Sequence, residues 1–307
     1  MDLGFASAIL PDLSLEEVLA FAAAEGFDCV EVMCWPTDAT DQRRYAGVTH
    51  IDVAALDEQG VQRVHELTRK YGVSISALGY YPNPLAADPV ESDTYVKHIG
   101  RVIEAARMLD VEVVNTFIGR DPSLPIERQW ERVEHIWRPL VAQAEAAGVK
   151  IGIENCPMLF SLDEWPGGKN LAISPTVWRE LFERLPSPSL GLNFDPSHLV
   201  WQGIDISRAL SEFANKLVHV HLKDEHVDQE LLYQRGIMGL GWHVPKIPGL
   251  GDIDWVEFFE TLRSVGWNRP VVIEVEDRTF EDSLEGRKEA IRRSGQYVRT
   301  VMEYGAR

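Results

Sequence analysis

The sequence predicts a (β/α)₈ barrel made of a single domain, residues 1–307. Short runs rich in β-branched residues alternate about eight times with longer amphipathic stretches, which is the pattern of parallel strands each followed by a helix. Domains average roughly 150 residues, but α/β barrels commonly reach about 250 residues as one domain. The chain shows no linker, low-complexity segment or internal repeat that would divide it. A doubly wound open sheet is the alternative, although such sheets usually have fewer strands.

The predicted strands are short runs of Val, Ile and Leu between turn residues. Such runs are typical of strands that are buried on both faces of a parallel sheet. In chain order the runs are Leu3–Ile9, Cys29–Met33, Val73–Leu78, Val111–Phe117, Val149–Glu154, Ser189–Phe194, Leu217–Leu222 and Val271–Val275. In a barrel their carboxyl ends meet at one mouth, where active sites of this fold lie.

The predicted helices lie between these strands and carry recognisable start and stop signals. Ser14 with Glu17 three residues later makes a capping box, and the helix that it begins ends near Gly26. Gly72 and Gly148 are stop signals for two later helices. The remaining predicted helices are Leu56–Tyr71, Tyr95–Leu109, Ile126–Ala147, Pro175–Leu185, Ile206–Ala214, Ile253–Val265 and Leu284–Tyr304.

Two long insertions interrupt the alternation, Pro36–Leu56 and Lys223–Gly251. Loops of this length in a compact domain usually form lids or binding segments. The second insertion carries polar and aromatic side chains that include His243. We expect it to bind part of a substrate, such as an aglycone, or a small helper subunit. The alternative is that its aromatic side chains pack the loop onto the barrel.

Composition and charge exclude several classes of protein. Asp and Glu outnumber Lys and Arg by 48 to 30, and the net charge of −18 argues against nucleic-acid and anionic-membrane partners. The cysteines, Cys29, Cys34 and Cys156, are too few for a disulfide framework and indicate a reducing compartment. We find neither a signal peptide nor an apolar stretch long enough to span a bilayer. These features predict a cytoplasmic protein, and they leave open a homo-oligomer.

Four polar residues occur at or near the ends of four successive predicted strands. They are Glu154 in IGIEN, Asp195 in NFDPSH, His221 in HVHLKD and Glu274 in VVIEVE. A charged residue within an apolar strand is costly unless it is paired or bound to a metal. The alternative is that each residue is an isolated strand-end cap or surface charge, but four together at one mouth favour a common site.

The chemistry of these four side chains predicts a divalent metal site. Three carboxylates held together would repel one another without a cation. Oxygen ligands with one imidazole suit Mn²⁺, Mg²⁺ or Co²⁺ better than Zn²⁺, which prefers nitrogen and sulfur ligands in structural sites. We expect one such ion per chain, with Mn²⁺ preferred.

Two of the predicted metal ligands have a similar residue two positions away on the same strand. His219 and His221 share a face, and His221 is the predicted ligand because it lies nearer the mouth, whereas His219 is expected in a buried layer. Glu274 and Glu276 share a face by the same rule. Glu274 lies inside the apolar run, so Glu276 is expected behind the ligands or in solvent.

The ordered set IGIEN, NFDPSH, HVHLKD and VVIEVE resembles the xylose-isomerase-like sugar phosphate isomerase/epimerase family, over nearly the whole chain. That family includes ketose 3-epimerases, inosose-processing enzymes and, more distantly, endonuclease IV. The resemblance implies that Glu154, Asp195, His221 and Glu274 bind one metal. It also implies that Glu154 and Glu274 are the catalytic acid and base, and that His198 contacts a substrate oxygen. For His198 the alternative is a loop histidine paired with a nearby carboxylate.

The chain also departs from these relatives. Endonuclease IV carries extra histidines after its third and fourth strands, and here those strands lead into ALGYYPNP and VNTFIGR, which argues against DNA repair. Asp252 stands where ketose epimerases often have a histidine, and Val227 stands near the place of an arginine. The motifs therefore indicate the superfamily without selecting a substrate.

The predicted activity is isomerisation or epimerisation of a keto-sugar or cyclitol through a metal-bound cis-enediolate. A Lewis-acid metal polarises the carbonyl and a carboxylate takes the neighbouring proton. A lyase or deglycosidase acting on a 3-keto-sugar or keto-glycoside is the alternative, because the same intermediate expels a β leaving group. A third interpretation is a non-catalytic, metal-stabilised protein that binds a sugar or acts as a scaffold.

Further side chains are expected to contact the carbohydrate. The predicted substrate-binding set is His198, Lys223, His243, Trp35 and Arg120. Aromatic walls are expected from residues that follow strands, namely Trp35, Tyr80, Phe117 and Trp165, although core packing explains each nearly as well. Cys156 is expected to be a bystander. The last strand leads into EVEDRTFEDSLEG, whose acidic residues predict a non-phosphorylated substrate, although Lys223, Arg235 and Lys246 partly offset them.

Overall fold

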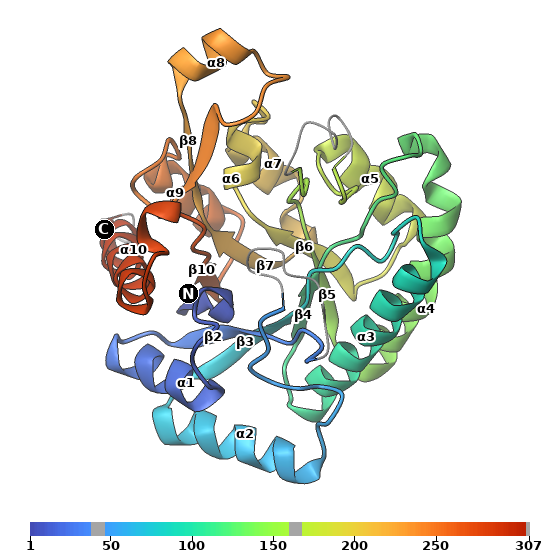
Figure 1. The fold of residues 1–307 in the computed structure, drawn as a ribbon, viewed down its shortest axis with the longest axis vertical. Coiled ribbons are helices and arrows are strands. Elements are labelled where there is room, and N and C mark those ends of the chain that lie inside the picture. The colour runs from blue at the N-terminus through green and yellow to red at the C-terminus, as the bar shows by residue number, and fades with distance from the viewer. Residues whose placement is uncertain (38–46, 160–167, 305–307) are drawn as a thin grey trace.

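The protein folds as a closed barrel of eight parallel strands surrounded by helices, which confirms the predicted fold class (Figure 1). The computed structural model describes residues 1–37, 47–159 and 168–304. Around the barrel the strands follow the order β1-β10-β7-β6-β5-β4-β3-β2. Their bounds are β1 Leu3–Ala6, β2 Cys29–Met33, β3 Ser74–Gly79, β4 Val113–Thr116, β5 Lys150–Glu154, β6 Leu190–Phe194, β7 Leu217–Leu222 and β10 Val271–Ile273.

Two strands end at least two residues earlier than the sequence predicts. The first ends at Ala6, because Ser7–Ile9 turns into a 3₁₀ helix. The last ends at Ile273, so Glu274 is the first residue after β10 rather than part of an apolar run. The pairing registers place Val272 of β10 beside His221 of β7. Glu274 therefore leaves the barrel wall next to the strand that carries the histidine.

The helices surround the barrel, and most lie where the sequence predicts. The capping box of Ser14 and Glu17 is present, and Gly72 ends a helix at a φ of 65°. The predicted helix Tyr95–Leu109 starts too late, because Asp88 caps a helix whose first residue is Pro89. The bounds are α1 Leu15–Ala24, α2 Glu58–Tyr71, α3 Pro89–Met108, α4 Trp130–Ala147, α5 Pro175–Arg184, α6 Ser197–Val200, α7 Ile206–Glu212, α9 Trp255–Ser264 and α10 Leu284–Tyr304.

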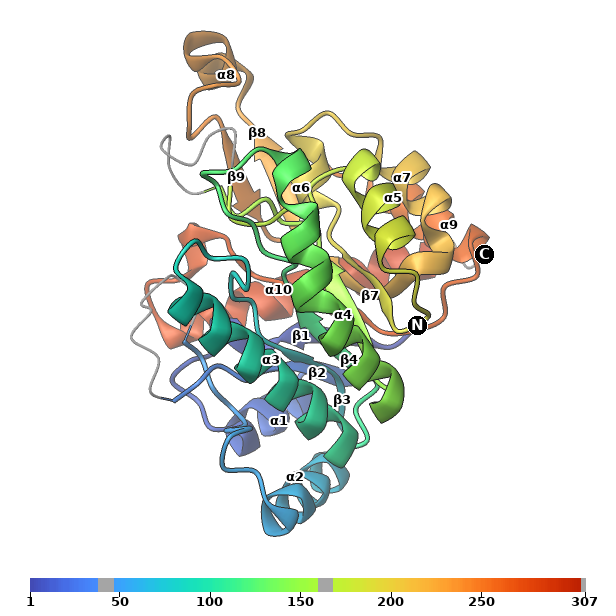
Figure 2. The same cartoon turned by 90° about the vertical axis from the view of Figure 1, so that its right-hand side faces the viewer.

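The insertion after β7 is structured rather than an irregular loop. It contains β8 Asp224–Val227, α8 Gln229–Arg235 and β9 His243–Lys246, and the two strands pair antiparallel. Figures 1 and 2 show α8 at the far end of this hairpin, away from the helices that surround the barrel. Asp224 anchors the base of the hairpin, because its carboxylate accepts the indole N–H of Trp255 at 2.8 Å.

The core has an apolar layer between strands and helices and a polar zone inside the barrel. Large side chains such as Trp137, Trp178 and Trp255 are fully buried in the outer layer. Buried polar and charged residues from the strands lie inside, among them Glu31, Asn115, Asn193, His219 and His221. None of the helices in the described ranges is both long and apolar enough to cross a membrane.

Candidate metal centre and active site

The structure brings together the four strand-end residues of the sequence analysis. Each of Glu154, Asp195, His221 and Glu274 offers a ligand atom, and these atoms all lie within 4.8 Å of one another. The side chains converge because β5, β6, β7 and β10 are neighbours in the barrel. The first three are buried, and the side chain of Glu274 is 19% exposed. We call these four residues the quartet.

Backbone and side-chain hydrogen bonds hold Asp195 in place. Its backbone N–H donates to Oδ1 of Asn155 at 2.8 Å, and its carbonyl accepts from Nδ2 of the same asparagine at 2.8 Å. Its Oδ1 atom accepts the backbone N–H of Ser197 at 2.9 Å. Its Oδ2 atom lies 3.1 Å from Nζ of Lys223 and 3.4 Å from Nε2 of His198.

A buried lysine lies beside the quartet. The Nζ atom of Lys223 is 2.6 Å from Glu274 Oε2, 2.9 Å from Glu276 Oε2 and 3.1 Å from Asp195 Oδ2. Burial works against the charged ammonium, but these carboxylates outweigh burial and raise the pKa of Lys223 well above its usual range. The side chain predicted to bind substrate therefore contacts two quartet carboxylates directly. Glu276 lies behind the quartet, where it contacts Lys223. This is one of the two positions that the sequence analysis predicted for it.

The carboxyl group of Glu154 differs in protonation from an ordinary glutamate. Burial and the neighbouring Glu274 raise the pKa of Glu154 to about 8, so this carboxyl holds a proton at neutral pH. Ligands of a small divalent ion lie about 2.0–2.2 Å from it, so opposite ligands are about 4.4 Å apart. Three oxygen donors and one nitrogen donor within 4.8 Å fit such an ion in number, chemistry and span. The cluster can therefore hold a divalent metal.

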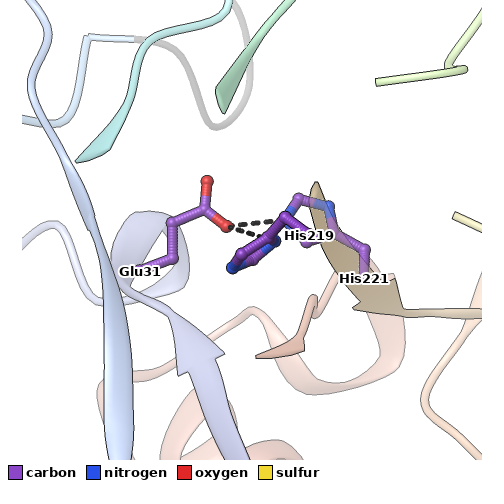
Figure 3. Close-up of side chains that lie close together, drawn as sticks. All are labelled: Glu31, His219 and His221. Atoms are coloured by element: carbon purple, nitrogen blue, oxygen red, sulfur yellow. Dashed lines mark hydrogen bonds and ion pairs between the residues drawn. The ribbon is translucent and has the colours of Figure 1, made fainter. Parts of the chain in front are cut away.

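His221 contacts carboxylates through both ring nitrogens. Its Nδ1 atom is 3.1 Å from Glu154 Oε1 and 3.6 Å from Glu274 Oε2. On the other side, Nε2 is 2.6 Å from Oε2 of Glu31, a residue of β2 (Figure 3). Burial disfavours the imidazolium, but Glu31 and Glu274 outweigh burial and raise the pKa of His221 well above its usual value. The sequence analysis missed Glu31, although a lone Glu in the apolar run CVEVM was a signal.

His198 lies next to the quartet as a neutral imidazole. Its Nε2 atom is 3.4 Å from Oδ2 of Asp195, and the residue is 8% exposed. Burial and the ammonium of Lys223 lower the pKa of His198 to about 3. This position is compatible with a contact to a substrate oxygen, which stays a prediction.

His243, at the base of the hairpin, contacts a carboxylate and stacks on an aromatic ring. Its Nδ1 atom is 2.6 Å from Oε1 of the buried Glu225. Its ring stacks on Trp201 with a centroid distance of 4.6 Å and an interplanar angle of 10°. Glu225 follows Lys223 by two residues, so the hairpin brings this imidazole to the side of the mouth where the quartet lies.

The remaining predicted contacts lie in less direct positions. Trp35 is 3% exposed and packs edge-on against Tyr80 at 4.9 Å, so both rings are buried. A contact of Trp35 with substrate stays a prediction. Phe117 packs against Tyr81 at 5.1 Å, and the Tyr81 ring in turn lies 6.3 Å from that of His221. Tyr81 therefore lies between Phe117 and His221, and the sequence analysis did not name Tyr81.

Arg120 is buried and Cys156 is half-buried. Arg120 is 7% exposed, and its backbone N–H donates to Asn83 at 2.8 Å, so the loop after β4 is pinned. Burial raises the pKa of the Cys156 thiol well above its usual value, which disfavours a catalytic thiolate and agrees with the bystander interpretation. Trp165 lies outside the described residues.

Comparison with known proteins identifies the family. The chain belongs to the xylose isomerase-like TIM barrel family, whose sequence model matches residues 19–300. The uncharacterized protein YfiH of Bacillus subtilis is 27% identical over 317 residues, which cover 91% of this chain and 94% of that protein. L-ribulose 3-epimerase of Mesorhizobium japonicum is 23% identical over 293 residues, covering 94% and 84%. An inosose dehydratase of Clostridium perfringens is 33% identical over 99 residues, covering 31% and 33%.

Solved structures agree on the fold. The IOLI protein with a zinc atom superposes with a TM-score of 0.73 at 18% identity, over 99% of both chains. D-psicose 3-epimerase in the presence of D-fructose gives a TM-score of 0.72 at 14% identity, over 98% of this chain and 99% of that one. The relatives of this family thus include sugar epimerases and a dehydratase, which confirms the resemblance seen in the sequence motifs.

Proposed function

We propose that the protein is a divalent-metal-dependent isomerase or epimerase acting on a non-phosphorylated keto-sugar or cyclitol. The observation that carries this proposal is the quartet, in which Glu154 and Glu274 both lie within reach of one cation site. Epimerases among the relatives of the chain support it. We propose Mn²⁺ as the metal, although a neighbouring structure holds zinc, because three oxygen donors and one imidazole suit Mn²⁺, Mg²⁺ or Co²⁺.

The two glutamates are suited to a proton transfer in two halves. A bound divalent cation supplies Lewis-acid polarisation of a carbonyl and its neighbouring hydroxyl. One glutamate then takes the proton from the carbon that carries this hydroxyl. The other glutamate returns a proton to that carbon from the opposite face and so inverts it. Return of the proton to the adjacent carbon isomerises the sugar instead.

The environments of the two glutamates already differ. Burial and Glu274 raise the pKa of Glu154, whereas Lys223 and His221 overcome burial and lower the pKa of Glu274. The pair therefore begins with one carboxyl protonated and one ionised, which is what an acid and a base require. His198, as a neutral imidazole, is proposed to bind a substrate oxygen beside them.

The charges near the mouth support a substrate without phosphate. The segment after β10 carries Glu276, Asp277, Glu281, Asp282 and Glu285. Three cations from the preceding insertion that could offset them are already engaged. Lys223 contacts three carboxylates, Lys246 lies 3.4 Å from Asp277, and Arg235 donates to the carbonyl of Leu240 at 2.7 Å.

A lyase on the same site is the second candidate. An inosose dehydratase is 33% identical over 31% of this chain, and the Glu225–His243 pair adds an oriented imidazole near the mouth. Such an imidazole is suited to protonate a departing hydroxyl or aglycone. Under this alternative the enediolate expels a β substituent instead of regaining a proton.

Deuterium exchange tests both candidates. Free ketoses, inososes, 3-keto-glucosides and ketose phosphates are incubated with the Mn²⁺-loaded protein in D₂O, with chelated protein and Glu154→Gln as controls. Deuterium at the carbon next to the carbonyl supports the epimerase, and loss of water or an aglycone supports the lyase. Absence of exchange with every sugar would leave the non-catalytic sugar-binding interpretation, and a preference for phosphates would contradict the proposed substrate class.

A further inference from the structure

Glu31 is a buried charged residue that the proposed proton transfer does not use. It lies in the middle of β2, is fully buried, and faces His221 across the barrel interior (Figure 3). Its Oε2 atom is 2.6 Å from Nε2 of His221, and its Oε1 atom accepts the hydroxyl of Tyr81. A Cβ at Gly79 would collide with this carboxylate, so the absence of a side chain there leaves room for it.

The charged neighbours of His221 lie on two sides of its ring. Nδ1 faces the quartet, with Glu154 and Glu274 at 3.1 and 3.6 Å, and Nε2 faces Glu31 at 2.6 Å. The side-chain amide of Asn193 lies beside both nitrogens, with Nδ2 3.1 Å from Nε2 and 3.4 Å from Nδ1. A carboxylate can only accept, so the short contact at Nε2 requires a proton on that nitrogen. In the neutral ring Nδ1 then carries the lone pair, and this lone pair points to the quartet.

We propose that Glu31 is a positioning residue for the metal centre. Its carboxylate holds the proton on Nε2 of His221, fixes the orientation of the ring, and so presents Nδ1 as the metal ligand. This inference rests on the proposed metal-dependent function. Ligand histidines commonly donate their second N–H to a carboxylate, and loss of that partner typically weakens metal binding by about 10–100-fold.

A second metal ion between Glu31, His219 and His221 is the competing explanation, because their ligand atoms also lie within 4.8 Å of one another. The existing contacts favour positioning. His219 Nδ1 is 3.8 Å from Glu31 but 3.1 Å from Oδ1 of Asn193, and its Nε2 atom lies 3.4 Å from Oγ of Ser76. His219 is thus partnered at both nitrogens, so it helps to support the interior rather than offering a free ligand.

Metal affinity measured by chelator competition tests the inference in the full-length protein. We expect Glu31→Gln, which removes the charge but keeps the size, to bind Mn²⁺ about 10–100-fold more weakly than the wild type. The matched control is Ser76→Ala, which perturbs the same interior network one residue further from His221 and should stay within about 3-fold. Equal affinity of Glu31→Gln and wild type would overturn the inference.

Two further results keep this inference separate from the proposed function. If the wild type binds no divalent metal, the proposed function fails; if it binds metal and Glu31→Gln binds equally well, only the role of Glu31 fails. Two ions per wild-type chain, one of them lost in Glu31→Gln, would overturn positioning in favour of a second site.

If Glu31→Gln does not fold, the inference can still be tested by NMR spectroscopy of the wild type. In the zinc-loaded wild type with ¹⁵N-labelled histidine, we expect the His221 resonances to show a proton on Nε2 and metal on Nδ1. Metal on Nε2 would overturn the inference without any variant.

Discussion

Replacing Lys223 by methionine tests how strongly the buried ammonium holds the surrounding carboxylates. The Nζ atom lies 2.6–3.1 Å from Asp195, Glu274 and Glu276, and the lysine side chain is only 2% exposed. Methionine keeps much of the volume but removes the charge. In the absence of metal, the three carboxylates then face one another with no cation between them.

The structure sets the size of the expected loss. Removing one partner of a buried ion pair costs about 3–5 kcal/mol of unfolding free energy. The side chains of Glu274 and Glu276 are 19% and 26% exposed, so water screens them in part. One carboxyl can also take up a proton, as Glu154 already does. We therefore expect the metal-free Lys223→Met variant to lose about 3 kcal/mol, at the lower end of that range.

Urea unfolding in EDTA, followed by circular dichroism, measures this difference. Lys246→Met is the matched control, because Lys246 contacts one carboxylate at 3.4 Å and its side chain is 23% exposed, so the loss there should be about 0–1 kcal/mol. Mn²⁺ at 100 times its dissociation constant should return about 2.7 kcal/mol to the Lys223→Met variant. A metal-free variant that loses no more than the Lys246→Met control would refute the reasoning.

Three further predictions concern metal, catalysis and pH. Chelation should abolish deuterium exchange and lower the melting temperature, since a metal bound to the native state stabilises it; activity after exhaustive dialysis against EDTA would contradict this. Glu154→Gln and Glu274→Gln should each lower turnover by about 10²-fold or more with metal bound, and near wild-type rates would rule out the two-glutamate mechanism. Burial lowers the pKa of His50, so the unfolded chain takes up this proton first and stability falls as the pH drops below about 6.5. His50→Asn should flatten that slope in urea unfolding between pH 7.5 and pH 5, and an unchanged slope would show that His50 does not cause it.

The fold and the quartet followed from local pattern. Alternation of apolar runs with capped amphipathic helices indicated the barrel, and the barrel rule then pointed to polar residues at strand ends. Glu154, Asp195 and His221 could be found in this way because each interrupts or directly follows an apolar strand. The hairpin after β7 could not, because β8 and β9 are only four residues each and are partly exposed, so they lack a buried apolar run.

The sequence by itself determined which strands carry charged side chains to the mouth, because strand order and the two-residue period are local properties of the chain. Only the tertiary structure decided what those side chains touch. Glu31 and His221 are 190 residues apart in sequence, and closure of the barrel brings β2 and β7 to face each other across its interior. From the sequence, Lys223 is expected to be a loop cation, whereas folding buries its ammonium among carboxylates of the residues that directly follow β6 and β10. Such contacts depend on the closed barrel, since burial removes the water that would otherwise solvate each charge and makes a partner necessary.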